Sequence, residues 1–498
     1  MENNRYRILV VSDISGMGGG GIPVFNQHLT EALAKQHDVT LFTAKPDTMP
    51  HEGARIVTTP ERPGKDVEFR DWLAQHAAQD PRSLGLPDPQ QRPFDLIIGH
   101  SRFSGPAATE LRDRWYPDAR VAHFLHTSPE RLPEVKLPNE PEKAKEKALR
   151  DATAERQVME RSDVVVGVGP LLTTEAERLA STGRHVPSSH QLIPGAKIED
   201  LVRHRPEGGR LNLLVMGRTD DALKGVDDAL RAVKLLNEEG VEVHLTIRGA
   251  DPETLADAVR DAHRLGGAQN VTVKPFTDNG DELKKDVIAA DAVIMPSKHE
   301  GFGLVATEAA GHGIPILVNQ ESGAAEFLGD KSRIDPKIGK PCIVPEPTGP
   351  GQRPGAWAKA INDLKADLPQ RRENAKELRE ALKAYSWDNA GQCLVEAAMK
   401  TTPKTRLGQG GPVAQQRLAT VQGPDGKLLG GENRAGATRA APPGPQTALA
   451  RAASLTSPGV RPPAQADAAR PTRPGPAPAP RPFHLPPTQP GPGRGPSR

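Results

Sequence analysis

The sequence has 498 residues, which is too long for one hydrophobic core of ordinary size, so two or three domains are expected. Residues 401–498 contain 13 Lys and Arg against three Asp and Glu, whereas 52 against 60 give residues 1–400 a net charge of −8. An acidic body argues against a folded surface for nucleic acid. Two cysteines are too few for a disulfide framework or a metal knuckle, which favours a reducing cytoplasm.

The first half of the chain begins with a strand, a glycine-rich turn, a helix and a second strand. The strands are predicted at residues 8–11 and 39–43, and this order predicts a parallel sheet. Gly16, Gly18 and Gly21 fit the G-x-G-x-x-G pattern of dinucleotide sites. The second strand, however, ends in F-T-A-K and offers no acid for a ribose, so we do not expect a dinucleotide site.

Two later strands of the first half end in histidines. The strand at 95–99 is followed by His100, and the strand at 119–125 by His126. Side chains at the carboxyl ends of parallel strands face the ligand crevice, so both are candidates. His100 is interpreted as a strand-end histidine that the backbone satisfies. Residues 49–93 are rich in Pro, Asp and Gln and are predicted to be irregular apart from a helix at 67–78.

The middle of the chain supplies a charged helix and a boundary. Residues 140–160 predict a solvated helix, followed by strands at 164–168 and 191–193 with a helix at 171–179 between them. Residues 204–210, which contain Pro and two Gly, predict a hinge between two domains.

The second half repeats the alternating plan. A strand at 211–216 ends at Arg218, and Lys224 precedes a helix at 226–237; further strands are predicted at 243–247 and 271–273. Two cations that bracket a strand-to-helix turn could bind a diphosphate, Arg in a bidentate manner and Lys as a point charge. The alternative is a pair of ordinary surface cations.

The stretch 294–326 is the most informative part of the sequence. A buried strand ends there, Glu300 follows in a loop, and Gly301-Phe302-Gly303-Leu304 begins a helix on which Glu308 projects. The first N–H groups of a helix have no internal partner and favour a phosphate. The alternative is a strand–loop–helix unit whose acids are only solvated.

The string E-G-F-G-L-V-x-x-E, together with G-R and K-G around the preceding turn, resembles the donor-site signature of retaining glycosyltransferases of family 4. The resemblance implies the GT-B fold, an α/β architecture of two Rossmann-like domains that face each other across a cleft. It implies an acceptor domain at 1–205, a donor domain at 206–400 with a final crossover helix, and a tail at 401–498.

The resemblance also implies roles for residues of the second domain. Glu300 would contact hydroxyls of the transferred sugar and Glu308 the ribose of the nucleotide, while the backbone at Phe302, Gly303 and Leu304 would meet the sugar and the diphosphate. Arg218 and Lys224 would bind the diphosphate. Five residues separate these two cations, where the family more often has four, so the turn is expected to bulge and to leave the aim of Lys224 less certain.

In the first domain the resemblance implies that Gly18 and Gly19 border the cleft near the diphosphate. His126, in the run H-T-S-x-E that Lys136 follows, would lie near the 6-position of the sugar and support catalysis. No D-x-D sequence occurs in the chain, which fits a metal-free, cofactor-free transfer of a hexosyl group. UDP is the expected nucleotide by family frequency, and the acceptor stays open.

Two other functions remain open at this stage. The chain could be a GT-B domain that has lost its activity and serves as a binding scaffold, or a nucleotide-sugar epimerase. No apolar run approaches the ~18 residues of a membrane span, although peripheral contact with a membrane stays open. The Pro-, Gly- and Arg-rich tail predicts disorder, with a partner-binding arm as the alternative.

Overall fold

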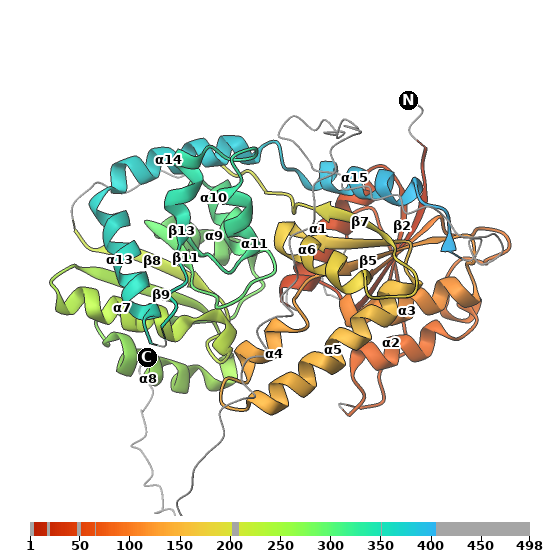
Figure 1. The fold of residues 1–498 in the computed structure, drawn as a ribbon, viewed down its shortest axis with the longest axis horizontal. Coiled ribbons are helices and arrows are strands. Elements are labelled where there is room, and N and C mark those ends of the chain that lie inside the picture. Colours follow the sequence, from red (N-terminus) through yellow and green to blue (C-terminus); the bar gives the residue numbers. More distant parts are fainter. Residues whose placement is uncertain are drawn as a thin grey trace, which may run out of the picture. The chain divides into compact units, whose positions relative to one another are not determined.

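The computed structural model describes residues 4–16, 20–46, 51–64, 66–201, 209–349 and 351–404. These residues form two fully parallel sheets with helices packed around them, and both sheets belong to one compact unit (Figure 1). The predicted boundary between residues 205 and 206 lies outside the described residues, and so does the predicted tail beyond residue 404.

The first sheet has the strand order β3-β2-β1-β4-β5-β6-β7. Its strands are β1 (Arg7–Ile14), β2 (Asp38–Lys45), β3 (Arg55–Thr58), β4 (Leu96–His100), β5 (Arg120–Leu125), β6 (Val164–Val168) and β7 (Ser188–Leu192). Within β1, Ile8 and Val10 belong to the apolar cluster on one face, and Leu9 and Val11 to the cluster on the other. Both faces are therefore covered, which explains the uninterrupted apolar runs of the sequence.

Helices connect these strands: α1 (Gly21–Ala34), α2 (Phe69–Ala77), α3 (Ser101–Arg114), α4 (Arg131–Lys136), α5 (Pro141–Arg161) and α6 (Gly169–Ala180), with a short 3-10 turn, η2 (Pro81–Leu84). The prediction that residues 49–93 hold only one helix is wrong, because β3 extends the sheet there. That strand has four residues, of which only Val57 is buried, so it is too short and too exposed to show a clear pattern.

The second sheet has the order β10-β9-β8-β11-β12-β13. Its strands are β8 (Leu211–Met216), β9 (Val243–Ala250), β10 (Val271–Pro275), β11 (Ala292–Met295), β12 (Ile316–Asn319) and β13 (Ile343–Val344). The helices around it are α7 (Val226–Glu238), α8 (Leu255–Gly266), α9 (Gly280–Ala289), α10 (Leu304–Gly311), α11 (Gly323–Gly329), α12 (Pro336–Gly339), α13 (Arg353–Ala366) and α14 (Leu368–Leu382), with the 3-10 turns η3 (Ala222–Lys224), η4 (Pro252–Thr254) and η5 (Lys340–Cys342).

Helix α7 shows how the pattern of the second half produces its packing. Val226, Ala229, Leu230 and Val233 recur at intervals of three and one and are all buried, so one side of the helix lies against the sheet. Acidic residues fill its first turn, where they stabilise the positive end of the helix dipole.

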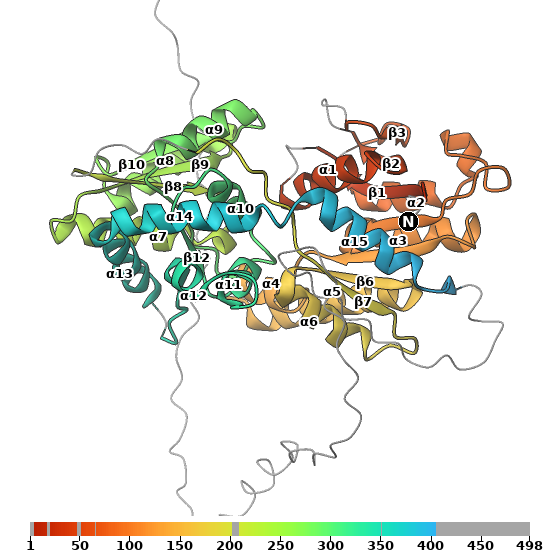
Figure 2. The ribbon, with the colours of Figure 1, turned by 90° about the horizontal axis from the view of Figure 1, so that it is seen from above.

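The last helix, α15 (Trp387–Met399), packs against α1 of the first sheet although it follows α14 of the second (Figure 2). The Ser386 hydroxyl accepts a hydrogen bond from the backbone N–H of Asn389 at 3.1 Å and so caps the start of this helix. The chain thus passes between the sheets twice, after β7 and before α15. The two passages touch: the N–H of Ala196 donates to the carbonyl of Tyr385 at 2.8 Å.

One apolar cluster is shared by the two sheets. Helix α6 packs against α11, and Leu172 of α6 belongs to the same buried cluster as Phe302 and Phe327 of the second half. Because this shared surface is apolar and buried, it brings the loops that follow β5 and β11 into contact.

Candidate functional site

The candidate site lies where the strand order of the second sheet reverses. Strands β8 and β11 are neighbours, but the chain runs from β8 outward through β9 and β10 before it returns to β11. In open parallel sheets the loops at such a point diverge and leave room for a ligand at the carboxyl ends of the strands. The loops after β8 and β11 carry the predicted residues Arg218, Lys224 and Glu300.

The loop after β8 accommodates its extra residue with a 3-10 turn. Asp221 precedes this turn, and its carboxylate accepts a hydrogen bond from the N–H of Leu223 at 3.1 Å. Gly225 follows with φ of 64°, and a Cβ atom there would lie 2.0 Å from the carbonyl oxygen of Pro296. Only glycine permits this approach, which holds the end of the turn against the loop after β11.

Lys224 and Glu300 form an ion pair between the two loops. Lys224 Nζ lies 2.7 Å from Glu300 Oε2, and the Ser297 hydroxyl donates to the same oxygen at 3.2 Å. The nearby Glu300 carboxylate raises the pKa of Lys224, which outweighs the effect of burial, so the lysine is charged. The longer turn between Arg218 and Lys224 was expected to bulge and to leave the direction of the Lys224 side chain uncertain. In the structure this side chain reaches Glu300.

Arg218 is placed differently. Its guanidinium lies 2.6 Å from Asp221 Oδ2, and its side chain is 62% exposed. Lys136, on α4 of the first half, reaches the same oxygen at 3.3 Å. Asp221 therefore binds one cation from each half of the molecule, and a second ion pair, Arg131 with Glu321 at 3.4 Å, joins the halves nearby.

The loop after β11 touches the end of β5 through a glycine. A Cβ atom on Gly301 would lie 2.3 Å from the carbonyl oxygen of His126 and 2.8 Å from Leu172. Phe302, only 4% exposed, packs against Phe327, and its ring also contacts Gly169. Because the phenylalanine ring is buried, only the backbone of this residue is available to a ligand.

Helix α10 begins at Leu304, directly after Gly303. Gly303 has φ of 101° and lies beside the Glu300 side chain, and it provides no side-chain cap for the first turn of the helix. The N–H groups of this turn therefore receive no side-chain cap from Gly303, and the anion site at this helix start stays a prediction. Gly303, whose backbone was predicted to meet the ligand, therefore lies beside Glu300 of the ion pair.

Glu308 lies one turn further along α10. Burial raises the pKa of its carboxyl group, and the positive charge of Lys197 opposes this shift. A half-buried carboxylate of this kind favours ligand groups that donate hydrogen bonds, such as the hydroxyls of a ribose.

The raised pKa of Glu308 gives a prediction for stability. Because the folded protein holds this proton more tightly than the unfolded chain, the stability falls as pH rises from the usual value of 4.5 through the folded pKa. Glu308→Gln should therefore match the wild type in free energy of unfolding at low pH and exceed it at neutral pH. Urea denaturation at several pH values measures this. Glu253→Gln, at an exposed glutamate, should show no such pH-dependent gain; an equal gain in both variants would contradict the assignment.

His126 and His100 lie at the carboxyl ends of neighbouring strands. His100 Nδ1 lies 2.9 Å from His126 Nε2, and His100 Nε2 lies 2.9 Å from Oδ1 of Asn26 on α1. The interpretation that the backbone satisfies the His100 ring is therefore wrong. The two histidines meet because of the register of the sheet. Gly99 of β4 aligns with His123 of β5, so both strands end at the same edge.

Gly18 and Gly19 lie outside the described residues. The residues on either side are described: Gly16 and Gly20 have φ of 98° and 101°, and α1 begins at Gly21. Both φ values lie in the region that glycine favours.

Asp221 is the main site residue that sequence analysis did not single out. It stands between Arg218 and Lys224 in the sequence, so the additional residue in that turn was the available signal. Its partner Lys136 was noted only as part of a resemblance, because no sequence pattern predicts a contact between α4 and the turn after β8.

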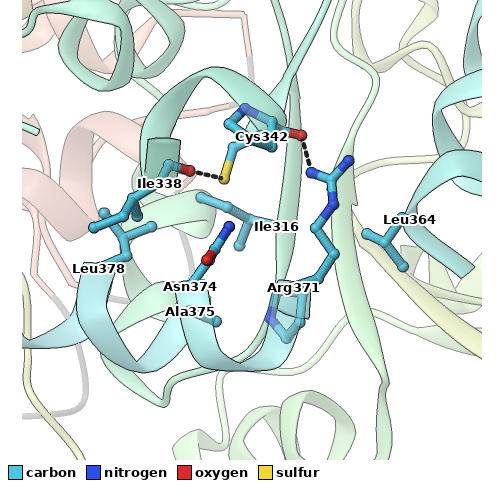
Figure 3. A pocket seen from close by; sticks show the side chains of 10 residues that line it. Ile316, Ile338, Cys342, Leu364, Arg371, Asn374, Ala375 and Leu378 are labelled. Carbon is cyan, nitrogen blue, oxygen red and sulfur yellow. Dashed lines mark hydrogen bonds between the residues drawn. The ribbon is translucent and has the colours of Figure 1, made fainter. Parts of the chain in front are cut away.

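A small cavity elsewhere is not a ligand site. It lies between β12 and α14 and is lined by apolar side chains together with Cys342, Arg371 and Asn374 (Figure 3). Its volume of 10 Å³ is at the lower limit for one water molecule. Burial raises the pKa of the Cys342 thiol to about 12, and its sulfur lies 3.4 Å from the Ile338 carbonyl, so the thiol stays protonated.

Within the described part of the chain, the structure holds no cluster of three or more His, Cys, Asp or Glu suited to a metal ion. None of its described helices combines the length and the apolar composition needed to cross a membrane.

Two parallel Rossmann-like sheets, with a candidate ligand site at the strand-end loops of the second, have the architecture of the GT-B class of glycosyltransferases. A family model described as "Family 4 Glycosyltransferase in conflict systems" matches residues 9–394. The chain belongs to this family, and the protein is a glycosyltransferase.

Individual proteins support the same assignment. The D-inositol 3-phosphate glycosyltransferase of Xylanimonas cellulosilytica is 26% identical over 429 residues, which cover 79% of this chain and 94% of the relative. The sucrose-phosphate synthase of Thermosynechococcus elongatus has a TM-score of 0.58 at 21% identity, covering 79% of this chain and 98% of that one. Anabaena Alr3699/HepE, solved in complex with UDP and glucose, has a TM-score of 0.54 at 17% identity, with 79% and 99% covered. These two structures share the fold.

Proposed function

We propose that this glycosyltransferase moves a hexosyl group from a UDP-sugar to a hydroxyl group of an acceptor, with retention of anomeric configuration. The observation that carries the proposal is the ion pair of Lys224 with Glu300 at 2.7 Å. It joins the two loops at the reversal of the strand order and places a cation and an acid side by side. A nucleotide sugar uses both: its phosphate binds the cation, and its sugar hydroxyls donate to the acid.

The basic groups of the site stabilise the leaving group. When the sugar departs, negative charge develops on the diphosphate, and Lys224, Arg218 and the first N–H groups of α10 are the groups that meet it. The electrostatic influence of Asp221 and Arg218 on the pKa of Lys224 supports their closeness. Arg218 exchanges its contact with Asp221 for the diphosphate, and Glu308 accepts hydrogen bonds from the ribose.

Glu300 and His126 lie on the sugar side of this arrangement. The contact of Gly301 with the His126 carbonyl holds the end of β5 against the loop after β11, which supports a sugar bound beside this junction. As the bond between the anomeric carbon and the diphosphate breaks, the leaving phosphate takes the proton of the acceptor hydroxyl, and the acceptor oxygen bonds to the anomeric carbon on the face that the diphosphate has left. This gives retention without a protein nucleophile or a metal ion. The fold of the Anabaena protein that was solved with UDP and glucose supports the choice of UDP.

The two sheets divide the substrates between them. We assign residues 1–205 to the acceptor and residues 206–400 to the donor, because Lys224, Glu300 and α10 all belong to the second sheet. The presence of only two cysteines in the sequence supports a cytoplasmic location.

The proposal is tested by calorimetry against a panel of UDP-, GDP-, ADP- and dTDP-sugars, with NMR of the products. We expect heat of binding with a UDP-sugar, weaker binding in Arg218→Ala, and slow hydrolysis that first releases sugar of the donor's anomeric configuration. Absence of heat with every donor would mean that the domain is a scaffold. A sugar that is epimerised while still attached to the nucleotide would mean that the protein is an epimerase. Either result contradicts the proposal.

A further inference from the structure

Three side chains from different elements form a buried line of hydrogen bonds at the edge of the first sheet. Asn26 comes from α1, His100 from the end of β4 and His126 from the residue after β5. The two contacts, Asn26 Oδ1 with His100 Nε2 and His100 Nδ1 with His126 Nε2, are both 2.9 Å long. The three residues are 0%, 1% and 8% exposed, so water does not compete for these bonds.

Both imidazoles are neutral. Burial lowers the pKa of His100 to about 3 and that of His126 well below 6.5; the nearby His123 adds to both shifts, and His100 adds to that of His126. A neutral imidazole carries one N–H, so one nitrogen donates and the other accepts. The position of a single proton on one ring therefore fixes the position on the next.

Asn26 sets the direction of the line. Its Oδ1 atom can only accept a hydrogen bond, and it also receives one from the Thr30 hydroxyl at 3.4 Å. His100 must then donate through Nε2 and accept through Nδ1. His126 in turn must donate through Nε2, which leaves its Nδ1 without a proton and able to accept.

Neighbouring rings hold this arrangement in place. The ring of Phe25 meets His126 edge-on at 4.8 Å, and Phe124 stacks on His126 at 5.7 Å with an interplanar angle of 17°. His100 also lies against both phenylalanines. Because close-packed rings leave no room for an imidazole flip, the identity of the donating nitrogen is fixed by hydrogen bonding.

We propose that His100 and Asn26 are positioning residues that hold His126 in its Nε2–H tautomer, so that Nδ1 accepts a hydrogen bond from a hydroxyl group of the transferred sugar. This role rests on the proposed function, which brings the sugar to His126. It also defines a specificity: an acceptor-only nitrogen favours a donor sugar with a hydroxyl at that position over one in which the hydroxyl is replaced by hydrogen or blocked by a methyl ether.

The amide of Asn26 makes the proposal sharply testable. In the observed orientation its Nδ2 is buried without a partner within the described residues. The opposite orientation would point Nδ2 at His100 and reverse every bond in the line, so that His126 would carry its proton on Nδ1. The tautomer of His126 thus reports directly on the direction of the line.

The experiment is nitrogen NMR of the full-length protein labelled with 15N in its histidine rings, without substrate. We expect His126 to be protonated on Nε2 at neutral pH in the wild type and to lose this preference in His100→Leu, which leaves no acceptor for that proton. His100→Gln should restore it, since the amide oxygen of Gln can accept the same N–H. His190→Leu, which removes another buried histidine of the same sheet, should leave the His126 signal unchanged.

Activity provides an independent readout. We expect kcat to fall roughly tenfold in His100→Leu, equivalent to about one hydrogen bond, and to recover in His100→Gln. A wild-type His126 that is protonated on Nδ1, or a tautomer that His100→Leu does not change, overturns the proposal. An enzyme that is inactive with every donor but shows the expected tautomers contradicts the proposed function alone, because the NMR result needs no turnover.

Discussion

Replacing Lys224 with Met should reduce kcat by about 10²–10³, the usual cost of removing one group that stabilises charge in a transition state. The ammonium group lies 2.7 Å from Glu300 and is charged, because the glutamate raises its pKa. Without it the diphosphate loses a cation at the moment it accumulates charge. Methionine keeps most of the length of the lysine side chain, so the packing of the turn after β8 is retained. Steady-state kinetics with the donor identified by calorimetry measures the effect.

Protein stability should change much less than the rate in Lys224→Met. The Lys224 and Glu300 side chains are 29% and 22% exposed, so the unpaired glutamate remains partly hydrated. We expect a loss of roughly 1–3 kcal/mol, between the values for surface and buried ion pairs. Lys234→Met, at an exposed lysine of α7, is the matched control and should retain full activity. Wild-type turnover in Lys224→Met would show that the cation does not act on the leaving group.

The second large effect on the rate is expected when one methyl group is added at Gly301. In Gly301→Ala the new Cβ would lie 2.3 Å from the His126 carbonyl, where no real contact can exist, so the end of β5 and the loop after β11 must separate. Overpacking of this kind costs about 1–3 kcal/mol, and if the strain is relieved by moving the two loops apart, kcat/KM should fall roughly 10- to 200-fold.

A matched glycine separates this effect from that of adding a methyl group in general. A Cβ on Gly280, at the start of α9, would meet no atom within 4 Å, so Gly280→Ala should keep its rate and its melting temperature. Kinetics and thermal melting of both variants make the comparison. An unimpaired Gly301→Ala enzyme would mean that this contact is absent from the arrangement that catalyses transfer.

The fold was predictable where strands are buried on both faces. Ile8 to Val11 form an unbroken apolar run, because parallel strands in this architecture are covered from both sides. Strand β3 was missed because only Val57 among its four residues is buried. Helix α3 was not predicted; its first residue, Ser101, has φ of 43°, and its interior contains Pro106. Both features obscure a helical pattern.

The individual residues of the site were easier to predict than their partners. Glycine spacing indicated the loop at Gly301 and the start of the helix after it, and α10 begins at Leu304. The contact of Arg218 with Asp221 and Lys136 depends on how α4 meets the second half, which local patterns do not encode. The pairing of His100 with His126 likewise depends on the adjacency of β4 and β5.

The hydrogen bond between Ala196 and Tyr385 has a mechanical consequence. This bond joins the two segments of chain that connect the sheets. The segments also pack closely at the adjoining Gly195, where a Cβ atom would lie 2.2 Å from the backbone nitrogen of Trp387. Domain movements in proteins are absorbed by a few such residues at the ends of elements. Within the described residues, the two passages are therefore held together beside the first sheet, so that neither passage can shift there without the other.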